Sequence, residues 1–284
     1  MHSFPVPHPD ILFSPTCMAI TDGPGRDPVL VQRSGSGLRP YLHPLRAADG
    51  RSLLTEDAPS HHPWQHGVSI GLNDPDGVGY WTEGRLADRA ATDGRISARP
   101  LAPPCFRDGA IAWTAGAEYR RPDGRLHLRE CQEWSWRALP GAGWVLDLDW
   151  ILAAADGPVS FPRYDYGGLF IRMPWHDGDP VAVLADHGAD RREDIDARPA
   201  RWVAMALCGV GGAWNTLAVV DHPGNPAHPQ PWRFDCGYGF GPGRCIAGPW
   251  LLEPGRPCRQ RYRLIALPGR PAAAAITPVA ESFP

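Results

Sequence analysis

The sequence predicts an all-β fold, an antiparallel β-sandwich, from two observations. Its 33 prolines and 32 glycines are spread over 284 residues and leave few stretches in which a helix of three turns can form. Between them lie short runs of strand-forming residues, without the alternation of strands and helices that parallel sheets need. Because 43% of the residues are hydrophobic, a sizeable core is available, and we expect one domain over residues 1–284.

The predicted strands are runs in which apolar and polar residues alternate. In the run 143–152 the even-numbered positions from Trp144 to Leu152 are apolar and share one face, opposite Asp147 and Asp149. This is the pattern of a strand with one buried face. Six further runs predict strands, at 110–114, 126–136, 168–173, 201–205, 216–220 and 260–267.

Three segments are expected to lie outside the sheets. Residues 1–28 form an N-terminal lead-in with weak order. The charged stretch 186–196 mixes both signs, which is typical of an exposed loop with solvated charges. Residues 268–284, rich in proline and alanine, are expected to lie along the surface or to fray.

Composition excludes several classes of protein. The net charge of −3 gives no bulk attraction to nucleic acid. The seven cysteines are scattered and odd in number, without a Cys-x-x-Cys pair, which argues against a disulfide framework or a zinc ribbon. The N-terminus has no signal-peptide pattern, and no window reaches the roughly 20 apolar residues of a spanning helix. We therefore expect a cytoplasmic protein with neither a nucleic-acid nor a membrane partner.

Histidines gather in two segments of the chain. The stretches 59–67 and 221–232, together with His43, hold six of the eleven histidines. A lone histidine is more often structural than chemical, but imidazole can shuttle protons near neutral pH, ligate metals or pair with sugar hydroxyls. Clustering therefore indicates a site. The candidate catalytic residues are His43, His62, His66 and His222.

The residue types of these two segments are also compatible with a site for a sugar-like small molecule. A sugar site needs aromatic faces against the ring and fixed polar groups for the hydroxyls. The twelve tryptophans supply such faces, although most tryptophans in proteins belong to the core. The candidate substrate-binding residues are Arg39, Tyr41, Trp64, Gln65, Asp221, Asn225, His228 and Trp232, and Trp81 is a further aromatic candidate.

The carboxylate that would partner a histidine stays open. Glu130 and Glu133 lie in one predicted strand at opposite parity, so only one of them can face a given site. Asp165 and Asp221 are the other candidates. No spacing points to the paired carboxylates of a glycosidase.

Metal binding is a competing interpretation of the same histidines. If a metal is bound, His43, His62 and His66 are its predicted ligands, in a three-histidine site with an open position for zinc or iron. Pro63 between His62 and His66 argues against a regular helix there. A nucleotide cofactor is not expected, because the glycines of 209–212 are too sparse to cradle phosphates. Nor does a Gly-x-Ser-x-Gly motif indicate a serine hydrolase.

Two motifs carry a resemblance to a known family. The first comprises Arg39-Pro40-Tyr41-Leu42-His43-Pro44, His61-His62-Pro63-Trp64-Gln65-His66-Gly67, Asn73-Asp74 and Tyr80-Trp81; the second comprises Asp221-His222-Pro223, Asn225-Pro226, His228-Pro229 and Trp232. In this order they resemble the signatures of the bacterial family labelled PmoA-like, or methane oxygenase PmoA, over residues 30–267.

That family is essentially of unknown function. The resemblance implies a β-sandwich of the supersandwich type, similar to galactose mutarotase, and an association with carbohydrates. The methane-oxygenase label fits this chain poorly, because a membrane subunit needs spanning segments. The chain also departs from the family pattern at His61, where an aspartate is frequent, so no acid–base role is carried over to that position.

Three functions follow from the sequence. The first is an enzyme that acts on a sugar or glycoside by histidine acid–base chemistry, as an epimerase, lyase or hydrolase. The second is a metal-dependent oxygenase or hydrolase, and the third is a non-catalytic sugar-binding module. In each case we expect His43, His62 and His66 to face one cleft. We also expect the second motif to reach the same pocket through His222, Asn225 or His228.

Overall fold

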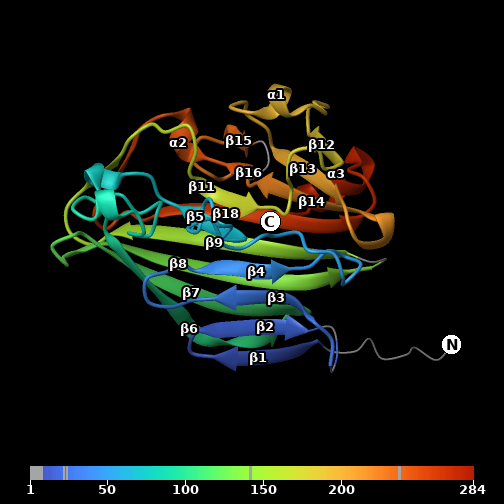
Figure 1. The fold of residues 1–284 in the computed structure, drawn as a ribbon, viewed down its shortest axis with the longest axis horizontal. Helices are drawn as coiled ribbons and strands as arrows, with labels where there is room; N and C mark the ends of the chain where they lie inside the picture. The colour runs from blue at the N-terminus through green and yellow to red at the C-terminus, as the bar shows by residue number, and fades with distance from the viewer. Residues whose placement is uncertain (1–8, 22, 24, 141–142, 236–237) are drawn as a thin grey trace.

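Two eight-stranded antiparallel sheets make up most of the chain in this computed structural model, which describes residues 9–21, 23, 25–140, 143–235 and 238–284 (Figure 1). The inner faces of the two sheets share one contiguous hydrophobic cluster. The predicted antiparallel β-sandwich is therefore confirmed.

The first sheet has the strand order β1-β2-β3-β4-β5-β11-β16-β15. Its strands are β1 (Asp10–Ser14), β2 (Cys17–Thr21), β3 (Pro28–Arg33), β4 (Tyr41–Leu45), β5 (Val68–Gly71), β11 (Gly168–Arg172), β15 (Trp232–Asp235) and β16 (Gly239–Pro242). The second sheet has the order β12-β13-β14-β18-β9-β8-β7-β6. Its strands are β6 (Arg95–Arg107), β7 (Ala110–Arg120), β8 (Leu126–Leu139), β9 (Gly143–Ala154), β12 (Val181–Ala185), β13 (Trp202–Cys208), β14 (Trp214–Asp221) and β18 (Cys258–Pro268).

The remaining elements are small. A two-stranded ribbon pairs β10 (Val159–Phe161) with β17 (Trp250–Leu252). The α-helices are α1 (Arg192–Ile195), α2 (Arg244–Ala247) and α3 (Ala273–Glu281), and the 3-10 turns are η1 (Pro75–Gly77), η2 (Ala87–Arg89) and η3 (Val210–Gly212).

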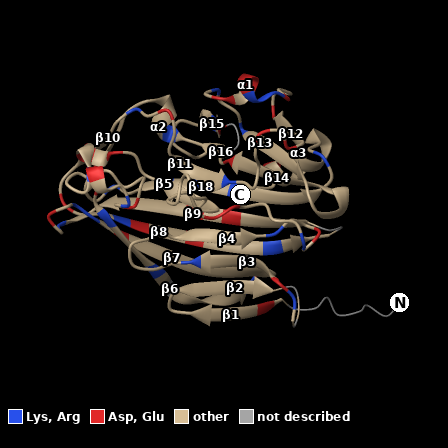
Figure 2. Cartoon of the chain, in the orientation of Figure 1, with Lys and Arg blue, Asp and Glu red and all other residues tan. Residues whose placement is uncertain are grey.

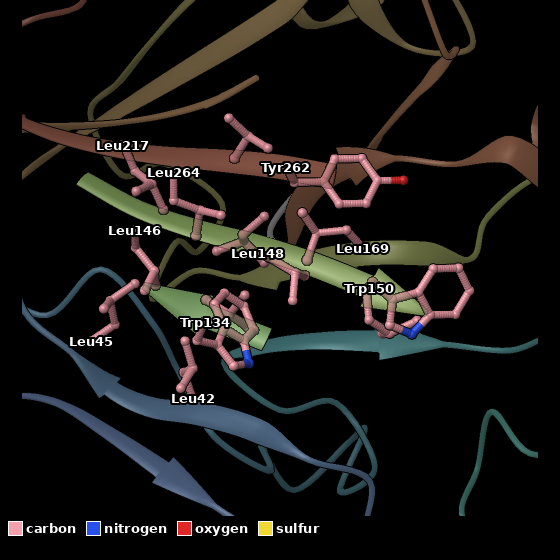
Figure 3. Packing of buried hydrophobic residues seen from close by; sticks show 14 of the residues in the cluster. Leu42, Leu45, Trp134, Leu146, Leu148, Trp150, Leu169, Leu217, Tyr262 and Leu264 are labelled. Carbon is pink, nitrogen blue, oxygen red and sulfur yellow. The ribbon is translucent and has the colours of Figure 1, made fainter. Parts of the chain in front are cut away.

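The core forms where β4 lies across from β8 and β9. Leu42 and Leu45 of β4 point toward Trp134 of β8 and Leu146 of β9, and all four are buried (Figure 3). The even-numbered face of β9 is buried from Trp144 to Leu152, as its alternation predicts. Each fully buried side chain of this size contributes roughly 1.5–3 kcal/mol, so this seam is a main source of stability.

The outer face of the second sheet is covered at one end by α3. Ile276 of this helix is fully buried against Val145 of β9 and Ile265 of β18, in a second hydrophobic cluster. Residues 268–284 therefore lie along the surface as a packed helix, and the alternative expectation, that they fray, is wrong. Alanine favours helix formation, and the apolar side chains at 276, 279 and 280 share the buried side.

Each predicted strand run falls on an observed strand, namely β7, β8, β9, β11, β13, β14 and β18, but most of these strands extend beyond the predicted ends, by six residues in β7. Weak order in the lead-in is wrong for residues 10–21, which form the edge hairpin of β1 and β2, whereas residues 1–8 lie outside the described part. The stretch 186–196 is largely exposed as expected, but it contains α1, and Ile195 anchors it in the core. Six cysteines are free thiols, and Cys236 lies outside the described residues.

Acidic and basic residues are interspersed over the loops and strand ends on the face shown in Figure 2. None of the helices in the described part of the chain combines the length and apolar character that crossing a membrane takes.

Candidate functional site

A cavity of about 300 Å³ lies where five segments of the chain meet. Its aromatic wall consists of Trp64, Trp81, Tyr164, Tyr166 and Tyr238. Its uncharged polar and imidazole groups belong to His62, Gln65, Asn73 and Thr82, and its charged groups to Asp74, Arg89, Arg233 and Asp235. Three larger hollows, of about 420, 440 and 630 Å³, have no histidine among the described residues that line them.

His62 stands in this wall on a tight double turn. The His62 amide donates to the Pro59 carbonyl at 2.9 Å, and the Gln65 amide donates to the His62 carbonyl at 2.9 Å. The segment is thus neither helix nor strand, as Pro63 indicates. The His62 ring meets the Trp64 and Tyr238 rings edge-on, at centroid distances of 5.4 and 5.2 Å. Burial, with the nearby charges of His61 and Arg172, lowers the pKa of His62, so its imidazole is neutral near pH 7 and able to accept a proton.

A fully buried arginine supports this wall from behind. Arg172 of β11 donates to Gln65 Oε1 and to Glu56 Oε2, each at 2.8 Å. Its guanidinium also lies against the Tyr238 ring, 4.6 Å from the centroid. Arg172 therefore fixes two cavity residues and leaves the Gln65 amide NH₂ for other partners.

Two arginines form four ion pairs in the charged part of the wall. Arg89 lies 3.2 Å from Asp74 and 3.1 Å from the buried Asp93. Arg233 of β15 pairs with Asp235 and, at 3.4 Å, with Asp196. Each guanidinium thus has two carboxylate partners.

His66 lies beneath the cavity wall and does not line it. Its Nδ1 is 2.6 Å from Asp57 Oδ1, its Nε2 is 3.1 Å from Glu83 Oε2, and its ring stacks on Tyr41 at 4.2 Å. Burial opposes a charge here, but the hydrogen bonds to Asp57 and Glu83 raise the pKa of His66. His66 is not among the described residues that line the cavity, and both of its ring nitrogens are held by the protein, so its expected catalytic role stays a prediction without support from this geometry.

Arg39 and Tyr41 also belong to this buried group. Arg39 is 2% exposed, and its Nε donates to Glu83 Oε1 at 2.9 Å. It also donates to the Trp81 carbonyl and lies 5.6 Å from the Trp81 ring centroid. Although burial alone would raise it, the Arg39 charge and the His66 hydrogen bond lower the pKa of Glu83 to about 2. Arg39 and Tyr41 do not line the cavity and contact residues behind its wall, so their expected substrate-binding roles stay predictions.

The predicted three-histidine metal site does not assemble. His43, on β4, has its Nδ1 atom 3.0 Å from Thr55 Oγ1, and burial lowers the pKa of His43. Of His43, His62 and His66, only His62 lines the cavity. Among the described residues, no group of three or more His, Cys, Asp or Glu side chains is placed to hold a metal ion. The nitrogens of His66 cannot ligate while Asp57 and Glu83 hold them.

The second motif builds the end of β14 and not the cavity. Asp221 accepts hydrogen bonds from Asn225 Nδ2 and the Gln230 amide at 2.8 Å each, and it lies 2.8 Å from His228 Nδ1. His222 lies 2.7 Å from the Pro284 carbonyl oxygen and meets the Phe283 ring.

The expected shared pocket is therefore wrong. His228 and Asp221 line a separate small hollow beside α3. Trp232 is fully buried and donates to the Ala200 carbonyl, so it is a core residue. The geometry thus gives local structural contacts to His222, Asp221, Asn225, His228 and Trp232, and none of them lines the cavity; their expected roles at a ligand stay predictions.

The candidate carboxylates fall elsewhere as well. Glu130 is buried in the core, where Tyr119, Gln132 and Trp150 donate to it at 2.6–2.8 Å, while Glu133 on the opposite face is exposed. This confirms their opposite parity and removes both from the cavity. Asp165 is exposed and is not among the cavity residues, although its neighbours Tyr164 and Tyr166 are.

Sequence reasoning missed most of the charged wall. Arg89, Arg233, Asp235 and Tyr238 line the cavity, and none was a candidate. Asn73 and Asp74 were noticed as part of the first motif, and Arg233 directly follows the candidate Trp232. A signal was therefore present in their closeness to the motifs, but not in their spacing.

Comparisons with known proteins identify the sequence family but no activity. The sequence profile described as "Family of unknown function (DUF6807)" matches residues 31–281. None of the curated proteins is significantly similar to this chain. The crystal structure of the Slr1438 protein from Synechocystis sp. PCC 6803 is similar over 92% of this chain and 96% of that chain, with 8% sequence identity and a TM-score of 0.41. These matches do not test the resemblance to the PmoA-like family, which stays a prediction.

Proposed function

Since this chain belongs to the family of unknown function DUF6807, we propose its function from the cavity itself: it binds a sugar or glycoside there and acts on it by acid–base chemistry with His62 as the base. One observation carries the proposal. Seven buried side-chain polar atoms of the described residues have no hydrogen-bond partner. Three of them, His62 Nδ1, Trp64 Nε1 and Arg233 Nε, belong to residues of this one cavity wall.

Unpartnered buried polar atoms are costly. Each costs roughly 1–3 kcal/mol unless a ligand or water satisfies it. Three on one wall therefore favour a ligand rich in hydrogen-bonding groups. The five aromatic rings supply the apolar surface that a sugar ring packs against.

The chemistry rests on His62 and a carboxylate of the same wall. The lowered pKa keeps His62 neutral, so it is ready to accept a proton from the ligand or from a bound water. Asp235 is the carboxylate whose charge opposes this shift, and it also lines the cavity. It is placed to stabilise the imidazolium that forms after proton transfer.

A substrate screen tests the proposal. The wild-type protein is incubated with neutral and oxidised mono- and disaccharides and with methyl glycosides, and conversion is followed by proton NMR while calorimetry measures binding. We expect at least one sugar to bind and to be converted. His62→Gln should lower the rate by about 10²- to 10⁴-fold, because that is the usual contribution of a general base. It should change the dissociation constant much less.

One control variant and one binding variant complete the test. His187→Ala removes an exposed histidine far along the chain from the cavity segments and should leave rate and affinity unchanged. Trp81→Ala should weaken binding by about two- to tenfold, the value of one aromatic contact. Binding without any conversion would reject the acid–base step, and no binding by any sugar would reject the site.

A further inference from the structure

We infer that the ligand of this cavity is an uncharged sugar, and that sugar acids and amino sugars are discriminated against. The inference rests on the proposed function and adds the charge of the substrate to it. Two features support it: the ion pairs that the charged groups of the wall form, and the donor or acceptor character of the buried atoms that have no hydrogen-bond partner.

Both arginines of the wall are already neutralised. Arg89 lies between Asp74 and Asp93, and Arg233 pairs with Asp235 and Asp196. Four carboxylates thus surround two guanidinium groups. A ligand carboxylate or phosphate would have to displace one of these partners and would then face the remaining excess of negative charge. Such a like-charge approach is a common way to reject a wrong ligand.

Two of the three unpartnered atoms argue against a cation. Trp64 Nε1 and Arg233 Nε are hydrogen-bond donors only, so they need an acceptor on the ligand. An ammonium group carries donors and no acceptor, even though five aromatic rings and two carboxylates would otherwise suit it.

A hydroxyl group meets both requirements. Its oxygen accepts from the Trp64 and Arg233 N–H groups, and its hydrogen donates to the carboxylates of Asp74 or Asp235. A sugar carries several hydroxyls at fixed spacing, which a wall of alternating donors and acceptors can recognise. Since the Trp64 N–H is buried, the ring has to turn slightly to reach the ligand, and binding should change tryptophan fluorescence.

Matched sugar triplets test the inference. Calorimetry at pH 6.5 compares D-glucose with D-glucuronate and D-glucosamine, and D-galactose with D-galacturonate and D-galactosamine. In the triplet that binds, we expect the neutral sugar to bind at least about tenfold more tightly than either charged form, a difference of about 1.4 kcal/mol. Equal or tighter binding of a charged form overturns the inference and leaves the proposed function standing. If no member of either triplet binds, the inference fails, whereas the proposed function fails only if no sugar of the wider screen binds.

Charge-neutralising variants give a second, independent reading. Asp235→Asn and Asp74→Asn each remove one negative charge from the wall. Each should therefore reduce the ratio of the dissociation constants of uronate and neutral sugar by about threefold or more. Asp190→Asn changes an exposed residue of the loop 186–196 and should leave this ratio of dissociation constants unchanged. A ratio of dissociation constants that is the same in all three variants contradicts the argument from charge pairing.

Discussion

His66 lies buried between two carboxylates, which raise its pKa and so favour its protonated form. Asp57 and Glu83 each lie on one ring nitrogen, and Arg39 lies on the far side of Glu83. When His66 is protonated the four groups alternate in sign, so each charge is paired although most of them are shielded from water. Breaking such a buried set by removing one member leaves an unpaired charge, which usually costs more than the intact set contributes.

Replacement of His66 by glutamine should therefore destabilise the fold in a pH-dependent way. The folded-state pKa of His66 is raised, so its stabilisation is fully present below the unfolded value of about 6.5 and is lost as pH rises through the folded value. At pH 6 the variant should lose about 3–5 kcal/mol of unfolding free energy relative to the wild type. The gap should shrink toward pH 9. Urea denaturation at several pH values measures it.

His187→Gln, at an exposed position, is the control and should stay within about 0.5 kcal/mol of the wild type throughout. If the difference in unfolding free energy between the wild type and His66→Gln does not change between pH 6 and 9, the His66 ring is not protonated in the folded protein.

Gly71 tests how closely the cavity wall depends on one contact. A Cβ atom at this position would lie 2.0 Å from an atom of the Trp81 ring, whereas one at Gly35 would meet nothing within 4 Å. Gly71→Ala should push Trp81 toward the cavity and weaken sugar binding by about tenfold or more. Gly35→Ala should leave it unchanged. Calorimetry with the bound sugar compares the two, and equal affinities would refute the role of Trp81.

At the scale of elements, alternation was the reliable signal. Strands with a period of two, such as β9 from Leu146 to Leu152, could be predicted because one face is buried against the other sheet. In β18 the residues 262–266 are all buried, since α3 packs on its outer face at Ile265. β6 was missed because Pro100, Pro103 and Pro104 interrupt it, which an edge strand with shifted register tolerates. α3 was missed because its proline and alanine content resembles that of a tail, and the apolar surface that receives it comes from distant strands.

The docking of α3 can be measured at one residue. Ile276→Ala should destabilise the protein by about 2–5 kcal/mol, because it empties a fully buried position against β9 and β18. Leu251→Ala removes as many carbon atoms from a side chain that is 52% exposed, and it should cost less than about 1 kcal/mol. Chemical denaturation gives both values. Equal losses would mean that α3 does not contribute to the cooperative fold.

For the molecule as a whole, the sequence could predict the sandwich but not where its chemistry lies. The histidine motifs are conspicuous in the sequence. In the structure, however, the stacked rings of Tyr41 and His66 are buried, and the second motif forms hydrogen bonds at the end of β14. Which of several histidines faces a cavity depends on partners such as Asp57 and Glu83. These have no fixed spacing to His66 and meet it only in the folded chain. His62, Trp64 and Gln65 were found because they share one short turn.

Stability should be distributed unevenly over the sandwich. The amides of β9 and β18 are bonded to strands on both sides at the centre of the second sheet, whereas β1 pairs on one side only. Hydrogen exchange followed by mass spectrometry should therefore show the slowest exchange in β9 and β18 and much faster exchange in β1. Protection of β1 equal to that of β18 would contradict this order.

The position of β18 has a consequence for synthesis on the ribosome. This strand comes after all other strands in the sequence, yet it lies between β14 and β9 and joins the two halves of the second sheet. Until residue 268 has emerged, β9 and β14 each present a free edge, and such edges invite pairing with other chains. Translation that stalls before residue 258 should leave nascent chains that depend on chaperones, since the last strand to be made completes the sheet.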